Sequence, residues 1–228
     1  MRIVDLGLIS FGEAQALQEA AVEEVLAGGE ERIFVLEHHP VVTFGRHGGE
    51  AFLRISPDAL RAMGIEVAKA SRGGSVTCHF PGQAVIYPVV RLSGRPGGLR
   101  KFFHDLEGAG MEALGSLGIE AVRSEGRPGV WIAPADGQNG PPEGHVGGLR
   151  KIGSVGVGVR RWVSYHGLAL NAGPDLSLFS MITACGLPGV EMTSAALELT
   201  RMGRAPEGAD VRRVKDALVQ AFLRVSAR

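Results

Sequence analysis

Residues 151–171 read KIGSVGVGVRRWVSYHGLALN, two apolar runs joined by a short basic and aromatic link. Valine, isoleucine and tyrosine favour extended backbone, so we expect strands over 151–159 and 163–171. Strands so close in sequence are typical of an antiparallel pair, because a parallel pair needs a long crossover connection. The stretch therefore predicts a protein whose sheet contains antiparallel strands.

Further strands and helices are expected on both sides of this pair. Apolar runs of strand length occur at 32–38, 40–46, 75–80, 83–92 and 129–134. Helical spacing or capping residues predict helices over 12–26, 56–64, 99–118 and 210–228. Ser56 and Asp210 are the expected N-caps of the second and fourth of these helices. Antiparallel strand pairs with flanking helices indicate an α+β fold, as one domain over residues 1–228.

A polar segment rich in proline and glycine, PADGQNGPPEGH, begins at Pro134 and lies between two predicted strands. Strand patterning resumes directly after it, which is unlike a linker between domains. We therefore predict a flexible surface loop at about 134–147.

Composition excludes several classes of protein. Lysine plus arginine and aspartate plus glutamate balance at 24 each, which favours neither nucleic acid nor an anionic membrane surface as a partner. No apolar run reaches the roughly 20 residues of a membrane span, and the N-terminal residues lack a signal-peptide pattern. With 2 cysteines in the chain, no disulfide framework is expected. We expect a cytoplasmic protein that binds neither nucleic acid nor membrane.

Lys151 has an unusual setting for a lysine. Alternate residues of a strand share a face, which places Lys151 on the same side as Val155 and Val157. Either the side chain reaches past the strand end into water, or it is partly desolvated and its lowered pKa makes it available as a base. The glycines of the same strand suggest that a ligand or another backbone approaches it closely.

A second cluster is SRGGSVTCHFPGQ, which begins at Ser71. Arg72, Gly73 and Gly74 can form a bend whose N–H groups point at an anion or an oxyanion. His79 lies near a predicted strand end, just before a Phe-Pro-Gly turn. The alternative is a plain hairpin with turn glycines and a histidine that is bound by the backbone.

Cys185 lies on a turn, because Gly186 and Pro188 follow it. An unreactive cysteine is usually buried in a core, whereas a turn exposes its thiol. A neighbouring cation, for which Lys151 and His79 are candidates, can lower a thiol pKa from about 8.5 to about 3.5–7.5. A cysteine with a base and a glycine-built oxyanion site is the equipment of covalent acyl transfer. The N–H groups of residues 74–75 or 185–186 are candidates for that site.

Four segments together resemble the octanoyltransferases of lipoate biosynthesis, also called lipoyl(octanoyl) transferases or lipoate biosynthesis protein B. They read RGGSVTCHFPGQAVIYPVV, GRPGVWI, KIGSVGVGVRRWVSYHGLALN and CGLPGVEMTS, in the family's order. The resemblance covers most of the chain from about Leu36 to Thr193. It implies the catalytic-domain fold shared by biotin and lipoate protein ligases, a mixed, largely antiparallel sheet flanked by helices.

The same resemblance implies an activity, the first step of protein lipoylation. The donor would be octanoyl-acyl carrier protein, and no cofactor or metal would be needed. The acceptor would be a lysine amine on the lipoyl domain of a 2-oxoacid dehydrogenase or on the glycine cleavage H protein.

The resemblance also implies roles for single residues. Cys185 matches the nucleophile that takes the octanoyl group as a thioester. Lys151 matches the lysine that lowers the thiol pKa and later handles the proton of the acceptor amine. The residues that match the family's acyl-binding positions are Arg72, Gly73, Gly74, Ser75, Val76, Thr77, Cys78, His79, Ser154, Val155, Gly156, Gly167, Leu168 and Ala169.

The alkyl chain and the carrier protein need matching surfaces. Val155, Val157 and Leu168 are candidates to bury the chain, at about 0.8 kcal/mol per methylene. The arginines that are candidates to meet an acidic carrier surface are Arg46, Arg91, Arg150, Arg160 and Arg161.

Two positions depart from the family, which typically has a tyrosine and a glycine where this chain has Cys78 and Phe80. We expect Phe80 to narrow the acyl site. We expect Cys78 to lie near that site and to be able to pair with Cys185 under oxidation.

Other functions remain open. An ATP-dependent lipoate or biotin ligase on the same fold would activate the acid as an adenylate and would need no cysteine. An amidotransferase that moves octanoyl groups between lipoyl domains would use the same thioester and would differ in its donor. A non-catalytic binding module would form no covalent adduct.

Overall fold

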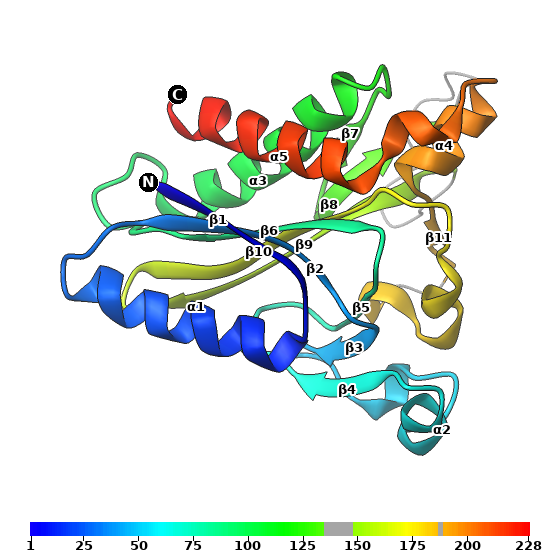
Figure 1. Ribbon diagram of the computed structural model, residues 1–228, viewed down its shortest axis with the longest axis horizontal. Helices are drawn as coiled ribbons and strands as arrows, with labels where there is room; N and C mark the ends of the chain where they lie inside the picture. Colours follow the sequence, from blue (N-terminus) through cyan, green and yellow to red (C-terminus); the bar gives the residue numbers. More distant parts are fainter. Residues whose placement is uncertain (135–147, 187–188) are drawn as a thin grey trace.

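The computed structural model describes residues 1–134, 148–186 and 189–228, and for Cys185 it describes the backbone alone. The predicted loop at about 134–147 therefore lies, beyond Pro134, outside the described residues. Figure 1 shows a large sheet with helices on both faces and a smaller sheet beside it.

The main sheet has the strand order β1-β2-β6-β10-β9-β8-β7. In chain order these strands are β1 (Arg2–Ile9), β2 (Arg32–His38), β6 (Gln83–Val89), β7 (Val122–Ser124), β8 (Arg127–Ile132), β9 (Arg150–Arg160) and β10 (Val163–Asn171). The short strand β11 (Glu191–Met192) pairs with the start of β9. β1 with β2 and β9 with β11 are parallel pairs, and the other pairs are antiparallel. The prediction of a mixed, largely antiparallel sheet is confirmed.

Helices cover both faces of this sheet (Figure 1). α3 (Gly98–Gly115) and α5 (Val211–Ser226) pack against each other on one face, with α4 (Ala195–Arg201) at their end. α1 (Phe11–Leu26) covers the opposite face. Because both faces are covered, every residue of the central strand β6 is buried.

The smaller sheet has the order β4-β3-β5, formed by β3 (Val41–Phe44), β4 (Glu66–Lys69) and β5 (Val76–His79). α2 (Pro57–Ala62) lies beside it (Figure 1). The structure also has short 3-10 helices, which are η1 (Glu50–Phe52), η2 (Ser177–Met181), η3 (Ala184–Gly186) and η4 (Pro206–Ala209). The N–H of Gly73 donates to the carbonyl of Val157 at 2.9 Å, which ties the segment before β5 to β9. The 72–79 segment therefore faces the β9–β10 hairpin.

Most predicted elements are confirmed, and β2 and β10 have the predicted bounds. The hydroxyl of Ser56 and the carboxylate of Asp210 accept N–H bonds at the starts of α2 and α5, as expected. The elements that sequence patterning missed are β1, β4, β7, β11 and α4. Most of these are too short to show a period. β1 is an edge strand whose Ile3 and Leu8 are 46% and 49% exposed, so its pattern does not mark a buried face.

Candidate active site

A cavity of about 230 Å³ lies between the β9–β10 hairpin and the 72–79 segment. Ser154 of β9 lies opposite Ala169 of β10, and Gly156 lies opposite Gly167, so the two strands form one continuous wall. The predicted site residues that line the cavity are Arg72, Gly74, Ser75, Val76, Thr77, His79, Lys151, Ser154, Val155, Gly156, Gly167, Leu168 and Ala169. Residues that are far apart in the sequence thus meet at one site.

Two of the predicted acyl-binding residues do not line the cavity. Cys78 is fully buried and packs in the core of the small sheet, because alternation on β5 turns it away from the side of Thr77 and His79. Gly73 contributes its N–H to the bond with β9 instead. Residues that sequence reasoning missed in the lining are Phe11, Tyr87, Gly126, Arg127, Pro128 and His166.

Lys151 is buried, with 2% of its surface exposed. Its Nζ donates to the carbonyl of Pro128 at 2.8 Å and lies 4.6 Å from the centre of the Trp131 ring. Gly129, between these two residues, has a φ of +139°, and a Cβ there would lie 2.8 Å from Nζ. The interpretation in which Lys151 reaches into water is therefore wrong: the amine lies in the cavity wall, in space that only a glycine leaves open.

The bend after Arg72 is held through its carbonyl groups. The N–H groups of residues 45–47 donate to carbonyls of residues 72–75. The Arg72 guanidinium donates to the carbonyls of Gly73 and Ser75. The N–H groups of Gly74 and Ser75 themselves make no hydrogen bond within the described part of the chain. Both residues line the cavity, so these N–H groups suit an oxyanion.

The turn that carries Cys185 is η3, which packs against β5. Gly186 has a φ of +67°, and a Cβ there would lie 3.1 Å from Oγ of Ser75, so the turn reaches the cavity wall at Ser75. The Gly186 N–H donates to the carbonyl of Thr183 at 3.0 Å and is not available to an oxyanion. The Cys185 side chain, and with it the predicted pairing with Cys78, lies outside the described part of the structure.

His79 is held in one tautomer by two side-chain amides. Nε2 of Gln83 donates to the Cys78 carbonyl and to Oδ1 of Asn171. Nδ2 of Asn171 in turn donates to the Thr193 carbonyl at 2.9 Å. Because carbonyls only accept, both amide orientations are fixed, and Oε1 of Gln83 accepts from Nδ1–H of His79 at 3.0 Å. Nε2 of His79 is therefore the nitrogen that accepts hydrogen bonds.

Burial keeps the histidines around the cavity neutral. It lowers the pKa of His79 well below its ordinary value, and the electrostatic interactions with His38 and with the Arg72 cation act in the same direction. Burial also lowers the pKa of His166 to about 3 and that of His38 to about 4. These rings therefore carry no charge at neutral pH.

Solved structures share this architecture. A crystal structure of lipoate-protein ligase A bound with ATP has a TM-score of 0.69 at 18% identity, and the match covers 98% of this chain and 84% of that chain. A bipartite lipoate protein ligase from Thermoplasma acidophilum has a TM-score of 0.66 at 18% identity, covering 98% and 82%. The fold is thus that of the catalytic domains of lipoate and biotin protein ligases.

Sequence comparison shows the family to which the chain belongs. The profile of the lipoyl protein ligase A/B catalytic domain matches residues 10–223. An octanoyltransferase of Nitratidesulfovibrio vulgaris (strain Miyazaki F) is 51% identical over 227 residues, covering 100% of this chain and 95% of the relative. An octanoyltransferase of Maridesulfovibrio salexigens is 46% identical over 199 residues, covering 87% and 86%. The chain belongs to the lipoyl protein ligase A/B catalytic domain family and is an acyltransferase.

Proposed function

We propose that this protein transfers an octanoyl group from octanoyl-acyl carrier protein to a lysine amine of a lipoyl domain, through a thioester on Cys185. The observation that carries the proposal is the buried amine of Lys151, in the wall of a cavity that the Cys185 turn reaches. Relatives at 51% and 46% identity are named octanoyltransferases, which supports the acyl group chosen here.

The chemistry has two balanced halves. In the first, the Cys185 thiolate attacks the donor carbonyl carbon, a new C–S bond forms, and the C–S bond to the carrier breaks. The carrier leaves as a thiolate that takes the proton of the Lys151 ammonium, so that Lys151 becomes a neutral amine. In the second, the neutral acceptor amine attacks the enzyme thioester, a C–N bond forms, and the Cys185 thiolate leaves. Lys151 accepts the proton that the amine loses, and the N–H groups of Gly74 and Ser75 bind the oxyanion in both halves. Because a thioester is exchanged for an amide, no ATP is consumed.

The alkyl chain of the donor lies in the cavity. Val155, Leu168 and Ala169 supply apolar lining, and burial there is worth about 0.8 kcal/mol per methylene. The expectation that Val157 joins them is wrong, since Val157 packs in the core under α3 and α5.

Replacement of Phe80 by leucine is expected to leave the preference for octanoyl over decanoyl donors unchanged. Phe80 does not line the cavity; it packs edge to face on Phe179, with ring centres 5.7 Å apart, in the core of the small sheet. The expectation that Phe80 narrows the acyl site is therefore wrong. The variant is expected to lose about 1–3 kcal/mol in free energy of unfolding, measured by urea denaturation. Val155→Phe, which fills the cavity itself, is the control and should shift the preference to shorter chains.

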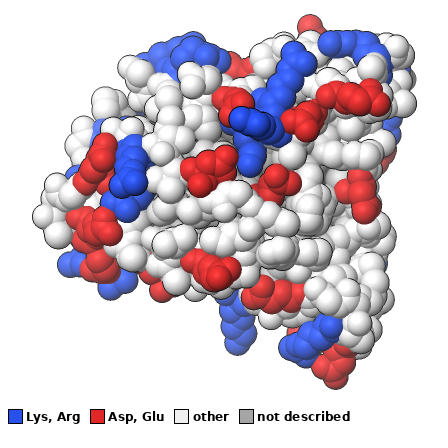
Figure 2. Space-filling view, viewed as in Figure 1, with Lys and Arg blue, Asp and Glu red and all other residues white. Residues whose placement is uncertain are grey.

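The protein partners we propose are octanoyl-acyl carrier protein and lipoyl domains, including those of 2-oxoacid dehydrogenases and the glycine cleavage H protein. Figure 2 shows acidic and basic side chains interspersed on one face of the molecule. Arg150 is not a surface contact for a carrier, because its guanidinium is bound by the buried Glu198. Arg160 and Arg161 both pair with the exposed Glu23. None of the described helices is long and apolar enough to cross a membrane.

Intact-mass measurement after incubation with octanoyl-acyl carrier protein tests the proposal. The protein should gain one octanoyl group without ATP, hydroxylamine should remove it, and a lipoyl domain added afterwards should take it up. An unmodified protein that labels a lipoyl domain only with free octanoate and ATP would instead be a ligase. If the protein takes the octanoyl group only from a lipoyl domain that already carries it, the protein is an amidotransferase.

A further inference from the structure

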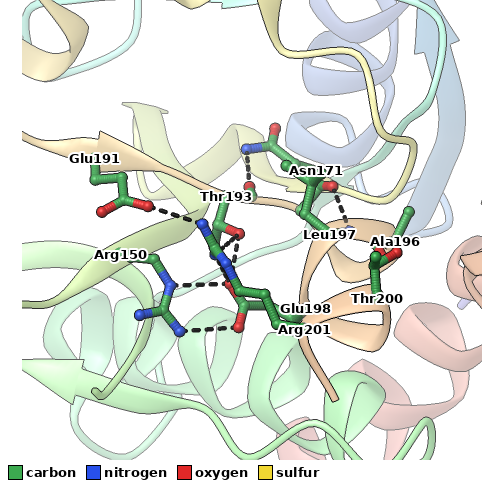
Figure 3. Close-up of polar contacts among 10 residues, drawn as sticks. Arg150, Asn171, Glu191, Thr193, Ala196, Leu197, Glu198, Thr200 and Arg201 are labelled. Carbon is green, nitrogen blue, oxygen red and sulfur yellow. Dashed lines mark hydrogen bonds and ion pairs between the residues drawn. The ribbon is translucent and has the colours of Figure 1, made fainter. Parts of the chain in front are cut away.

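Glu198 is a buried carboxylate outside the cavity, in the first turn of α4. Only 4% of its surface is exposed. Arg150 binds it with two parallel bonds, Nε at 3.0 Å and Nη2 at 2.9 Å, and Arg201 binds it from its own helix. Figure 3 shows both guanidinium groups converging on this carboxylate. The bidentate geometry fixes the direction of the Arg150 side chain as well as its charge.

The hydroxyl of Thr193 completes this cluster. It donates to Oε1 of Glu198 at 2.5 Å and accepts from Arg201 at 3.0 Å. Thr193 is fully buried, and its backbone is bonded on both sides. Its N–H donates to the carbonyl of Lys151 at 2.9 Å, and its carbonyl accepts from Nδ2 of Asn171 at the same distance. Thr193 is thus tied to Glu198 by its side chain and to β9 and β10 by its backbone.

These bonds connect the two segments that the proposed chemistry uses. Lys151 directly follows Arg150 on β9. The chain that leaves the Cys185 turn becomes β11, where Met192 lies opposite Lys151, and it continues into Thr193. The ladder between β11 and β9 has only two residue pairs, which is little to hold a register. The side-chain hydrogen bonds of Glu198 stabilise the register between β11 and β9, which this short ladder fixes only weakly.

The charges of the cluster are matched, so Glu198 stays ionised. Burial acts to raise the pKa of its carboxyl, but the hydrogen bonds from Arg150 and Thr193 outweigh burial and leave the pKa below the ordinary value. Glu191, the other carboxylate in Figure 3, is more than half exposed, and among the described residues its carboxylate pairs only with Arg201. Glu191 is therefore a suitable control for Glu198. Both bind Arg201, but Glu191 lies at the surface, whereas Glu198 also holds β9 through Arg150.

We propose that Glu198 is a positioning residue, which holds the strand of Lys151 and the segment of Cys185 at the spacing that their chemistry requires. This inference rests on the proposed function. It assigns no contact between Glu198 and the substrate. Replacing the carboxylate by an amide of the same shape removes the charge that fixes Arg150, so β9 and β11 can shift against each other.

The test compares Glu198→Gln with Glu191→Gln in three measurements. These are steady-state kinetics with octanoyl-acyl carrier protein, the pH dependence of Cys185 alkylation by iodoacetamide, and thermal unfolding. For Glu198→Gln we expect kcat to fall by up to about 10²-fold with KM unchanged, as for a small misplacement of reacting groups. We expect the midpoint pH of alkylation to rise, because the Lys151 cation no longer stabilises the thiolate as well. Glu191→Gln should match the wild-type protein in kcat, in KM and in the midpoint pH of alkylation.

A Glu198→Gln variant that melts earlier but keeps the wild-type kcat and alkylation midpoint would overturn the inference, since Glu198 would then serve stability alone. If that variant does not fold, Thr193→Val replaces it, because it removes one hydroxyl and keeps both backbone bonds; the same two changes are expected, and their absence overturns the inference. Failure of the proposed function is seen separately, as a wild-type protein that takes no octanoyl group from the carrier.

Discussion

The Cys185→Ser variant, incubated with octanoyl-acyl carrier protein, is expected to gain no octanoyl group, so that its mass stays that of the untreated variant. A serine hydroxyl is not ionised near neutral pH, whereas a thiol with a pKa of about 8.5 or less supplies a thiolate. Loss of a catalytic nucleophile typically costs on the order of 10⁶ in kcat, so transfer to the lipoyl domain should fall below detection. Intact-mass spectrometry and a gel-shift assay of the lipoyl domain measure the two effects.

The matched control is Cys78→Ala. Cys78 packs in the core of the small sheet and does not line the cavity, so this variant should still take up one octanoyl group. It is also expected to be less stable, because a buried side chain is truncated. Labelling of Cys185→Ser together with no labelling of Cys78→Ala would move the nucleophile to Cys78.

The Lys151→Met variant is expected to lose about 10²–10⁴ in the rate of octanoyl transfer, the usual contribution of a positioned acid or base. Methionine has a similar length and suits a buried site beside Trp131, so the fold should be retained. Both halves should slow, since the thiolate loses a neighbouring cation and the acceptor amine loses a proton acceptor. Single-turnover kinetics of acyl-enzyme formation and decay separate the two.

Lys215→Met provides the comparison for Lys151→Met. Lys215 is also buried, at 7% exposure, but its amine lies near Asp5 and Glu37 and does not line the cavity. Its replacement should lower the melting temperature and leave transfer rates unchanged. Equal losses of rate in both variants would mean that the effect reflects stability rather than the site.

The sequence predicts the strands of the site well, because periodicity and turn residues act locally. The β9–β10 hairpin and the 72–79 segment are both evident from patterning, and the structure brings them together around one cavity. Strand alternation also separates Thr77 and His79 from Cys78 and Phe80. The resemblance to the family, taken position by position, predicts instead that Phe80 narrows the acyl site.

What the sequence does not predict depends on contacts between distant elements. Lys151 is buried because Pro128 and Trp131, on another strand, supply a carbonyl and a ring, and the register shift that aligns them is a feature of the β8–β9 pairing. From its sequence context Arg150 is predicted to be a surface arginine. In the structure its guanidinium is bound by Glu198 of α4. That helix is only 7 residues long, too short to be recognised by period, so the sequence pattern gives no indication of the role of Glu198.

The neutral histidines in and beside the cavity have a consequence for kinetics. His38 and His166, with pKa values of about 4 and about 3, do not change charge between about pH 5 and pH 8, where an ordinary histidine would titrate. His79 is shifted in the same direction. Protonation of these two rings therefore does not change the affinity of the cavity for an uncharged alkyl chain across this range. A pH–rate profile measured between about pH 5 and pH 8 should therefore carry no contribution from His38 or His166.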